Sequence, residues 1–76
     1  MKEQSYLLNG LQLNPNGLES NYYYALFLLK TNHGFAMAEN YLRKAQNSSE
    51  SFLDKTAVQL LKSEINTIIS NGVNTN

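Results

Sequence analysis

The pattern of apolar positions is densest over residues 18–30, where the sequence reads LESNYYYALFLLK. Every residue from Tyr22 to Leu29 is apolar or aromatic. A helix on a protein surface carries one apolar stripe, whereas a helix that is apolar nearly all round is buried on several sides. The pattern therefore predicts a central helix over residues 18–31, with the other segments packed around it.

A first helix is predicted over residues 2–13. Gly10 lies inside it at a cost of about 1 kcal/mol relative to alanine, which we attribute to a close neighbouring helix that a side chain would block. Residues 14–17, which read NPNG, end this helix because the residue before a proline avoids the helical conformation. Asn16 then caps the central helix, with Glu19 completing a variant of the capping box. The leucines that share one face of the first helix are Leu7, Leu8 and Leu11.

A third helix is predicted over residues 35–46, after a break at residues 32–34 (NHG), and the residues Asn47 to Ser49 end it. Glu39 and Arg43 form an i, i+4 pair in the favourable order. The narrow apolar face of this helix consists of Phe35, Ala38, Leu42 and Ala45.

A fourth helix is predicted over residues 51–70, with distinct apolar and polar faces. Asn71 and Gly72 form its stop signal, because both residues tolerate the left-handed conformation. The predicted domain spans residues 1–72, and residues 73–76 form a disordered tail. The apolar face is Leu53, Ala57, Leu60, Leu61, Ile65 and Ile68, and the polar face is Lys55, Gln59, Lys62 and Asn66. The fold class is thus all-α, with four helices in antiparallel order joined by short loops.

Composition narrows the classes of partner. The chain has 76 residues, no cysteine and a formal net charge of zero. Its lysines and its arginine are scattered without a basic face, which disfavours nucleic acid and anionic membranes. Residues 18–29 are too short and too interrupted to span a bilayer, and the first residues do not read as a signal peptide. The sequence does not indicate the cellular compartment of the protein.

No constellation of catalytic residues is present, and we expect neither an enzyme nor a bound cofactor or metal ion. His33 is the single histidine and lies in a predicted loop without other metal-ligand types at suitable spacing. Ser48, Ser49 and Ser51 lack a histidine partner and are interpreted as helix caps. The acidic residues are spread over several helices.

Residues 10–16 (GLQLNPN) resemble the end of a tetratricopeptide repeat, in which a small residue and a leucine precede a polar turn with proline and asparagine. Tyr24, Ala25 and Leu28 then match the first helix of the next repeat, and residues 18–51 span about one repeat length, roughly 34 residues. The small and large positions of its second helix are matched by Ala38, Leu42 and Ala45. The resemblance implies stacked helical hairpins.

The chain also departs from the repeat pattern. Asn21 occupies the place of the usual tryptophan, one extra residue is needed between the two helices, and no proline closes the repeat. The fourth helix has one apolar and one polar face, which suits the last helix of a repeat array, because its outer face is exposed to water. Because repeat proteins need about three repeats for stability, we expect the chain to be part of a larger protein.

The resemblance implies a non-catalytic module that binds a peptide or an adjacent domain. Such modules are common in bacterial secretion and cell-envelope proteins, and by this analogy we expect a bacterial protein. The competing interpretation, for the residues of the central helix, is packing against neighbouring helices alone. The alternative function is self-association through the first helix, by Tyr6, Leu7 and Leu11. The partner-binding residues that the resemblance places on the concave face are Glu19, Tyr22, Leu26, Leu29 and Lys30.

Overall fold

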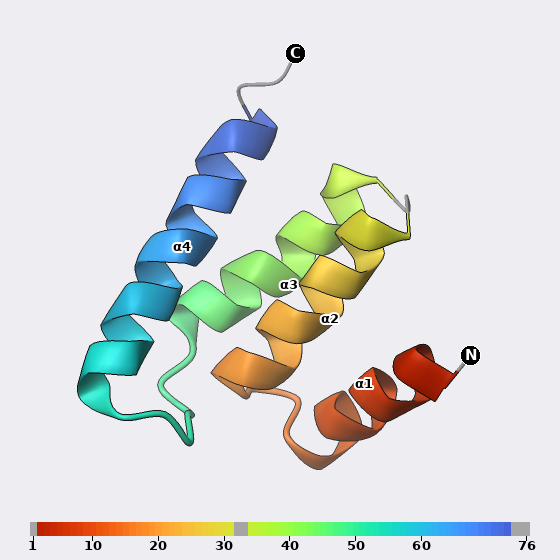
Figure 1. Ribbon diagram of the computed structural model, residues 1–76, viewed down its shortest axis with the longest axis horizontal. Coiled ribbons are helices and arrows are strands. Elements are labelled where there is room, and N and C mark those ends of the chain that lie inside the picture. The colour runs from red at the N-terminus through yellow and green to blue at the C-terminus, as the bar shows by residue number, and fades with distance from the viewer. Residues whose placement is uncertain (1, 32–33, 74–76) are drawn as a thin grey trace.

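The fold is all-α, as predicted. The structure is a computed structural model that describes residues 2–31 and 34–73, and it contains four helices. They lie side by side in chain order, with α1 and α4 at the two edges (Figure 1). Their bounds are α1 Lys2–Leu13, α2 Leu18–Lys30, α3 Phe35–Asn47 and α4 Lys55–Val73. The first three helices match the predicted ranges to within one residue at each end.

Helix α2 is the most buried of the four. It packs against α1 on one side and against α3 on the other. Tyr24 is a core residue, and the centre of its ring lies 4.8 Å from that of Tyr41 and 6.1 Å from that of Phe27. The buried residues of α2 are Leu18, Asn21, Tyr22, Tyr24, Ala25, Phe27 and Leu28. The all-round apolar pattern therefore does correspond to burial on several sides.

Helix α3 lies between α2 and α4 and presents the predicted narrow face to them. Ala38, Leu42 and Ala45 have no exposed surface, and Phe35 is half-buried against the same core. Alanine at two of these positions lets the neighbouring helices approach closely. The predicted pair on the outer side also forms, with Arg43 Nη2 2.6 Å from Glu39 Oε2.

Helix α4 begins at Lys55, so the predicted start at residue 51 is wrong. Asp54 is the N-cap, because its carboxylate accepts a hydrogen bond from the N–H of Ala57 at 2.8 Å. Leu53 lies outside the helix, and Leu60 is 68% exposed, so neither belongs to the core face. The residues of α4 that pack against the core are Val58, Leu61, Ile65, Ile68 and Ile69.

Helix α4 continues through Gly72 to Val73, so the predicted stop is wrong as well. A Cβ atom at Gly72 would lie only 2.0 Å from the ring of Phe35. Glycine at this position therefore allows the start of α3 to pack against the end of α4. Residues 74–76, most of the predicted tail, lie outside the described residues.

The turn between α1 and α2 differs from the predicted capping box. Gly17, rather than Asn16, is the N-cap residue of α2, and no side chain caps it. The buried Asn21 side chain instead holds the turn, since its Nδ2 donates to the carbonyls of Pro15 at 3.0 Å and Gly17 at 2.7 Å. The Oδ1 atom of Asn21 is buried and has no partner within the described part of the chain.

The same turn is bound to the segment that connects α3 and α4. The N–H of Leu18 donates to the carbonyl of Glu50 at 2.9 Å, and Ser48 Oγ donates to the carbonyl of Asn16. The serine hydroxyl of Ser51 donates to the carboxylate of Glu19. Ser48 is the C-cap residue of α3, and its side chain also links the two connecting segments. Ser51 does not cap α4, contrary to the prediction, and binds the first turn of α2 instead. We call residues 14–17 and 48–54, with these contacts, the loop junction.

A side chain would have room at Gly10 but not at Gly72, so the two glycines allow a matched test. A Cβ at Gly10 would meet only Ser20 Oγ, at 3.7 Å, which is an ordinary contact. The neighbour is close, with Ser20 Oγ donating to the carbonyl of Gly10 at 3.3 Å, but it would not block a side chain, contrary to the prediction.

We expect Gly10→Ala to raise the free energy of unfolding by up to about 1 kcal/mol, because alanine is the better helix former. Gly72→Ala should instead lower it, since the ring of Phe35 must move away. Urea unfolding followed by circular dichroism measures both. Equal stabilisation by the two substitutions would contradict the packing of Phe35 on Gly72.

Candidate functional site

A groove runs between α1 and α2. It consists of two adjoining hollows that share Tyr6, Leu7 and Tyr23 in their lining. The hollows have volumes of about 450 and 550 Å³, within the range of ligand-binding pockets. Besides the shared residues, one hollow is lined by Asn9, Gly10, Leu13, Glu19 and Ser20, and the other by Glu3, Leu26, Phe27 and Lys30. We call the two hollows together the α1–α2 groove.

Large apolar and aromatic side chains are exposed along this groove. Tyr6 is 78% exposed, Leu13 87% and Tyr23 49%. Single exposed apolar residues are ordinary, but contiguous ones mark a surface that interacts with other molecules. Tyrosine adds a polar tip to a large contact area, a combination that is enriched at protein interfaces. The groove therefore has the composition of a binding surface.

Three of the five residues predicted to bind a partner line the groove. Leu26 is half-buried against the core and lines the same hollow as Lys30. Lys30 Nζ lies 3.3 Å from Glu3 Oε1, and both side chains are largely exposed, so this pair adds little stability. Glu19 lines the other hollow.

Glu19 is also a residue of structural importance. Its carboxylate accepts hydrogen bonds from Ser51 Oγ and, at 3.2 Å, from the N–H of Phe52. It thereby holds the α3–α4 segment against the start of α2. A substitution at Glu19 would disturb the loop junction together with any partner contact.

The other two predicted residues do not line the groove. Leu29 has 36% of its surface exposed but lines neither hollow. Tyr22 is only 5% exposed, and its ring packs edge-on against that of Tyr23 with 5.2 Å between the centroids. Tyr22 therefore supports the groove from beneath through the ring of Tyr23.

Tyr23 is the central groove residue that the sequence prediction missed. Its signal lies in the run of three tyrosines, because successive helical residues point about 100° apart. With Tyr24 in the core and Tyr22 turned to a second buried side, the middle tyrosine is left to face outward. Leu13 was missed as well, and Tyr6 was predicted only for self-association, because their place in the groove depends on how α1 lies on α2.

The hydroxyl of Tyr22 has unusual electrostatics. Burial, followed by the negative charge and hydrogen bonding of Glu64 on α4, raises the pKa of Tyr22 from 10.0 to about 12. Both effects favour the neutral phenol over the phenolate. The phenol thus stays protonated at neutral pH and cannot act as a base there.

A third hollow, of about 560 Å³, lies by the C-terminal half of α3 and is lined by polar and charged residues; we call it the polar hollow. Arg43 in its wall is paired with Glu39, and Lys44 Nζ lies 5.4 Å from the ring centre of Tyr41. The end of α3 carries the negative pole of its dipole, which disfavours anions. The lining residues are Asn16, Asn40, Arg43, Lys44, Asn47, Ser48, Ser49 and Glu50.

Residues 2–31 and 34–73 contain no group of three or more histidine, cysteine or acidic side chains placed to hold a metal ion. His33, predicted as a loop residue, lies outside the described residues. None of the helices described in residues 2–73 is both long and apolar enough to cross a membrane.

Comparison with known proteins adds no assignment. No family model, curated protein or solved structure matches the chain.

The raised pKa of Tyr22 predicts a pH-dependent stability. Below pH 10 the phenol is neutral in both states, and its full contribution is present. Between pH 10 and about 12 the unfolded chain binds fewer protons than the folded chain, so the free energy of unfolding falls as pH rises.

Urea unfolding between pH 9 and 11.5 should show this fall, and Tyr22→Phe should reduce it. The comparison isolates Tyr22 because the substitution removes one hydroxyl and changes no other ionisable side chain. Identical pH profiles of the two proteins would show that Tyr22 is not perturbed.

Proposed function

We propose that this chain is a non-catalytic protein-interaction module, which binds a peptide segment or an adjacent domain in the α1–α2 groove. The observation that carries the proposal is the open groove with the exposed rings of Tyr6 and Tyr23 along it. Binding would need no chemistry from the chain, only a fixed surface presented by two packed helices.

Two features support a helical-repeat architecture of the tetratricopeptide type. Each helix packs against its neighbours in sequence, as in stacked hairpins. The contacts of the loop junction join residues 32 or 33 positions apart, for example Ser48 with Asn16 and Phe52 with Glu19. This separation is close to one repeat of roughly 34 residues. The two connecting segments thus resemble equivalent turns of successive repeats.

The assignment of a binding rather than a catalytic role rests on the side chains near the groove. Catalysis by polar side chains needs a nucleophile or base within reach of a second group that activates it. Glu19 is engaged by the loop junction, Lys30 is paired with Glu3, and Tyr22 is held neutral. The groove offers contact area instead.

Substitution of Tyr23 tests the proposal. We expect Tyr23→Ser to weaken a bound peptide at least tenfold, because exposed aromatic anchors dominate such interfaces. Peptides selected from a displayed library against the full chain provide the ligands, and isothermal titration calorimetry provides the affinities. Met37→Ser, at an exposed apolar position on α3, is the matched control and should bind normally. Equal loss in both variants, or selection of no peptide, would contradict the groove.

A second candidate function is self-association through α1. Helix α1 packs mainly against α2, and it leaves Tyr6 and Leu13 largely exposed. A net charge of zero offers no overall repulsion between copies. Leu7 and Leu11, which the sequence suggested for this contact, are half-buried against α2, so Tyr6 and Leu13 would have to carry it.

Sedimentation velocity across a hundredfold range of concentration distinguishes this candidate. A dimer that Tyr6→Ser and Leu13→Ser dissociate is the result expected for self-association through α1. A sedimentation coefficient that stays that of a monomer of 8.6 kDa at every concentration would exclude it.

A further inference from the structure

We propose that the groove binds an amphipathic helix whose apolar face is flanked by lysine or arginine. The inference rests on the proposed function, since it specifies the chemistry of the partner at the same surface. It follows from three observations: the shape of the groove, its apolar lining and the sign of the charges around it.

The shape favours a helical partner. The walls of the groove are two helices, α1 and α2, and a third helix can lie between two packed helices with its side chains in the grooves between theirs. Amphipathic helices bind in this way through apolar anchors at i, i+3, i+4 and i+7. Tyr6, Tyr23 and Leu26 provide the apolar surface for such anchors.

The charges favour a basic partner. Glu19 lines the groove near the loop junction, and Glu3 lines it at the other end. Glu64 of α4 lines neither hollow and lies beside Tyr22, whose ring contacts Tyr23. Lys30 is the one lysine or arginine among the described lining residues, and Glu3 already neutralises it.

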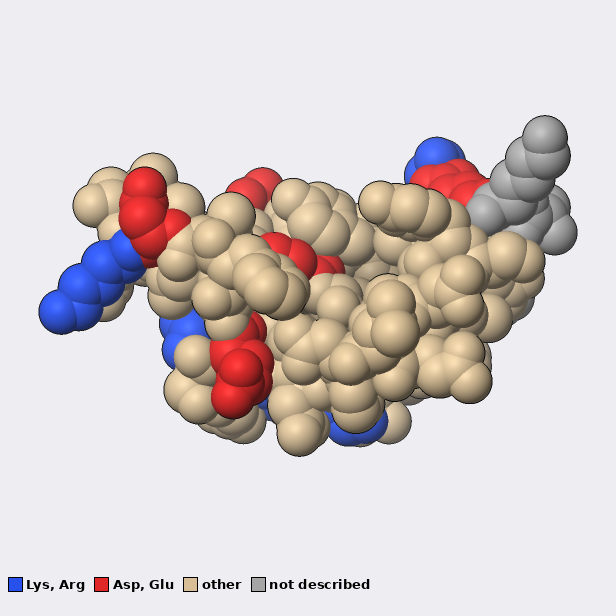
Figure 2. Space-filling model, turned by 90° about the horizontal axis from the view of Figure 1, so that it is seen from below, with Lys and Arg blue, Asp and Glu red and all other residues tan. Residues whose placement is uncertain are grey.

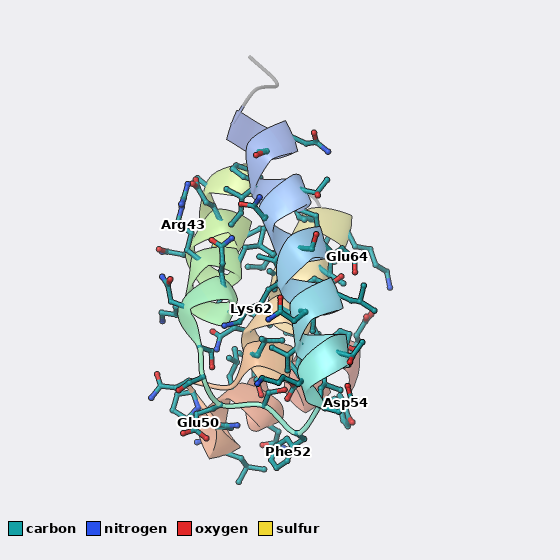
Figure 3. The ribbon with its side chains drawn as sticks, turned by 90° about the vertical axis from the view of Figure 1, so that its left-hand side faces the viewer. Arg43, Glu50, Phe52, Asp54, Lys62 and Glu64 are labelled. Atoms are coloured by element: carbon teal, nitrogen blue, oxygen red, sulfur yellow. The ribbon has the colours of Figure 1, made fainter. Side chains whose placement is uncertain are left out.

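The basic residues are scattered, and two of them lie away from the groove, on α3. Figure 3 shows Glu64 and Asp54 on one side of α4 and Arg43 on the opposite side, on α3. Arg43 and Lys44 line the polar hollow rather than the groove. Seen from the end that carries the loop junction, the surface is mostly uncharged, with acidic and basic side chains among the uncharged ones (Figure 2). The charged residues that line the groove itself are Glu3, Glu19 and Lys30, so its lining is negative overall and attracts a partner with positive charges.

Neither α1 nor the polar hollow of a second copy fits the groove as well as a basic helix. Arg43 and Lys44 lie beside the polar side chains of Asn40 and Asn47. The exposed apolar residues of α1 lie instead next to acidic Glu3. These two surfaces thus offer either basic or apolar side chains, whereas the groove calls for both.

The test uses two synthetic helical peptides of 18 residues with the same leucine-rich face and one tryptophan. The flanking positions carry lysine in one peptide and glutamate in the other. Because the chain has no tryptophan, fluorescence anisotropy of the peptide reports binding directly. We expect the lysine peptide to bind the full chain at least tenfold more tightly at low salt, with the preference shrinking at 0.5 M salt as charges are screened.

Chemical shifts should map the bound lysine peptide to Tyr6 and Tyr23. Equal affinity of the two peptides, or tighter binding of the glutamate peptide, would overturn the basic-partner inference and leave the groove as a binding site. Binding of neither peptide, with library peptides still bound, would also overturn the inference alone. Failure of every peptide would overturn the proposed function as well.

Matched variants then locate the charge effect. Glu3→Gln, at an exposed lining residue, should weaken the lysine peptide about two- to fivefold, the range for one exposed ion pair. Glu50→Gln makes the same change of net charge at the polar hollow and should have no effect. Equal weakening by both would overturn the inference, since it would reflect net charge alone. A dimer that the peptide must dissociate before it binds would show that a second copy occupies the groove, which also overturns it.

Discussion

The two connecting segments at one end of the molecule hold each other, and the placement of the outer helices depends on this contact. Neither segment forms regular secondary structure of its own, so their backbone groups need partners from elsewhere. The carbonyl of Glu50 accepts a hydrogen bond from the N–H of Leu18, and the carbonyl of Asn16 accepts one from the hydroxyl of Ser48. The carboxylate of Glu19, in the first turn of α2, accepts a further hydrogen bond from the hydroxyl of Ser51. The start of α4 is thereby anchored near the start of α2.

Because of this anchoring, α2 contacts all three of the other helices. Helix α2 is apolar nearly all round, and each of its sides has a different use. The side with Ala25 and Leu28 forms the core with α3, and Tyr22 meets α4 through Glu64. The side with Tyr23 and Phe27 faces α1 and leaves the groove open. The apolar run thus combines burial within the chain with exposure to a partner, two uses that the sequence pattern cannot separate.

Much of the fold could be predicted from local signals, and the exceptions have a common cause. The bounds of α1, α2 and α3 follow from apolar spacing and from the breaks at residues 14–17 and 32–34. The start of α4 does not, because Ser51 and Asp54 are both competent caps. The choice is made by Glu19, a residue 32 positions away, which engages Ser51. In the same way Gly72 resembles a helix stop until the ring of Phe35 is seen against it.

The candidate site was predictable only in part for the same reason. The resemblance placed Glu19, Tyr22, Leu26, Leu29 and Lys30 on a concave face, and three of them, Glu19, Leu26 and Lys30, lie in the lining of the groove. It could not show that Tyr22 lies beneath Tyr23, because that depends on where α4 lies. It could not show the α1 wall either, since the angle at which α1 crosses α2 is not encoded in the spacing of its leucines.

The span of the loop junction has a consequence for the order of folding. Its contacts close a loop of 32 residues that contains all of α3 and most of α2. Closing a loop costs entropy that grows with the logarithm of its length, and the cost is lower once the intervening chain is already compact. We expect the α2–α3 hairpin to form first from near contacts, as in other helical proteins of low contact order. Helices α1 and α4 would then join a preformed centre, so the groove would be completed late in folding.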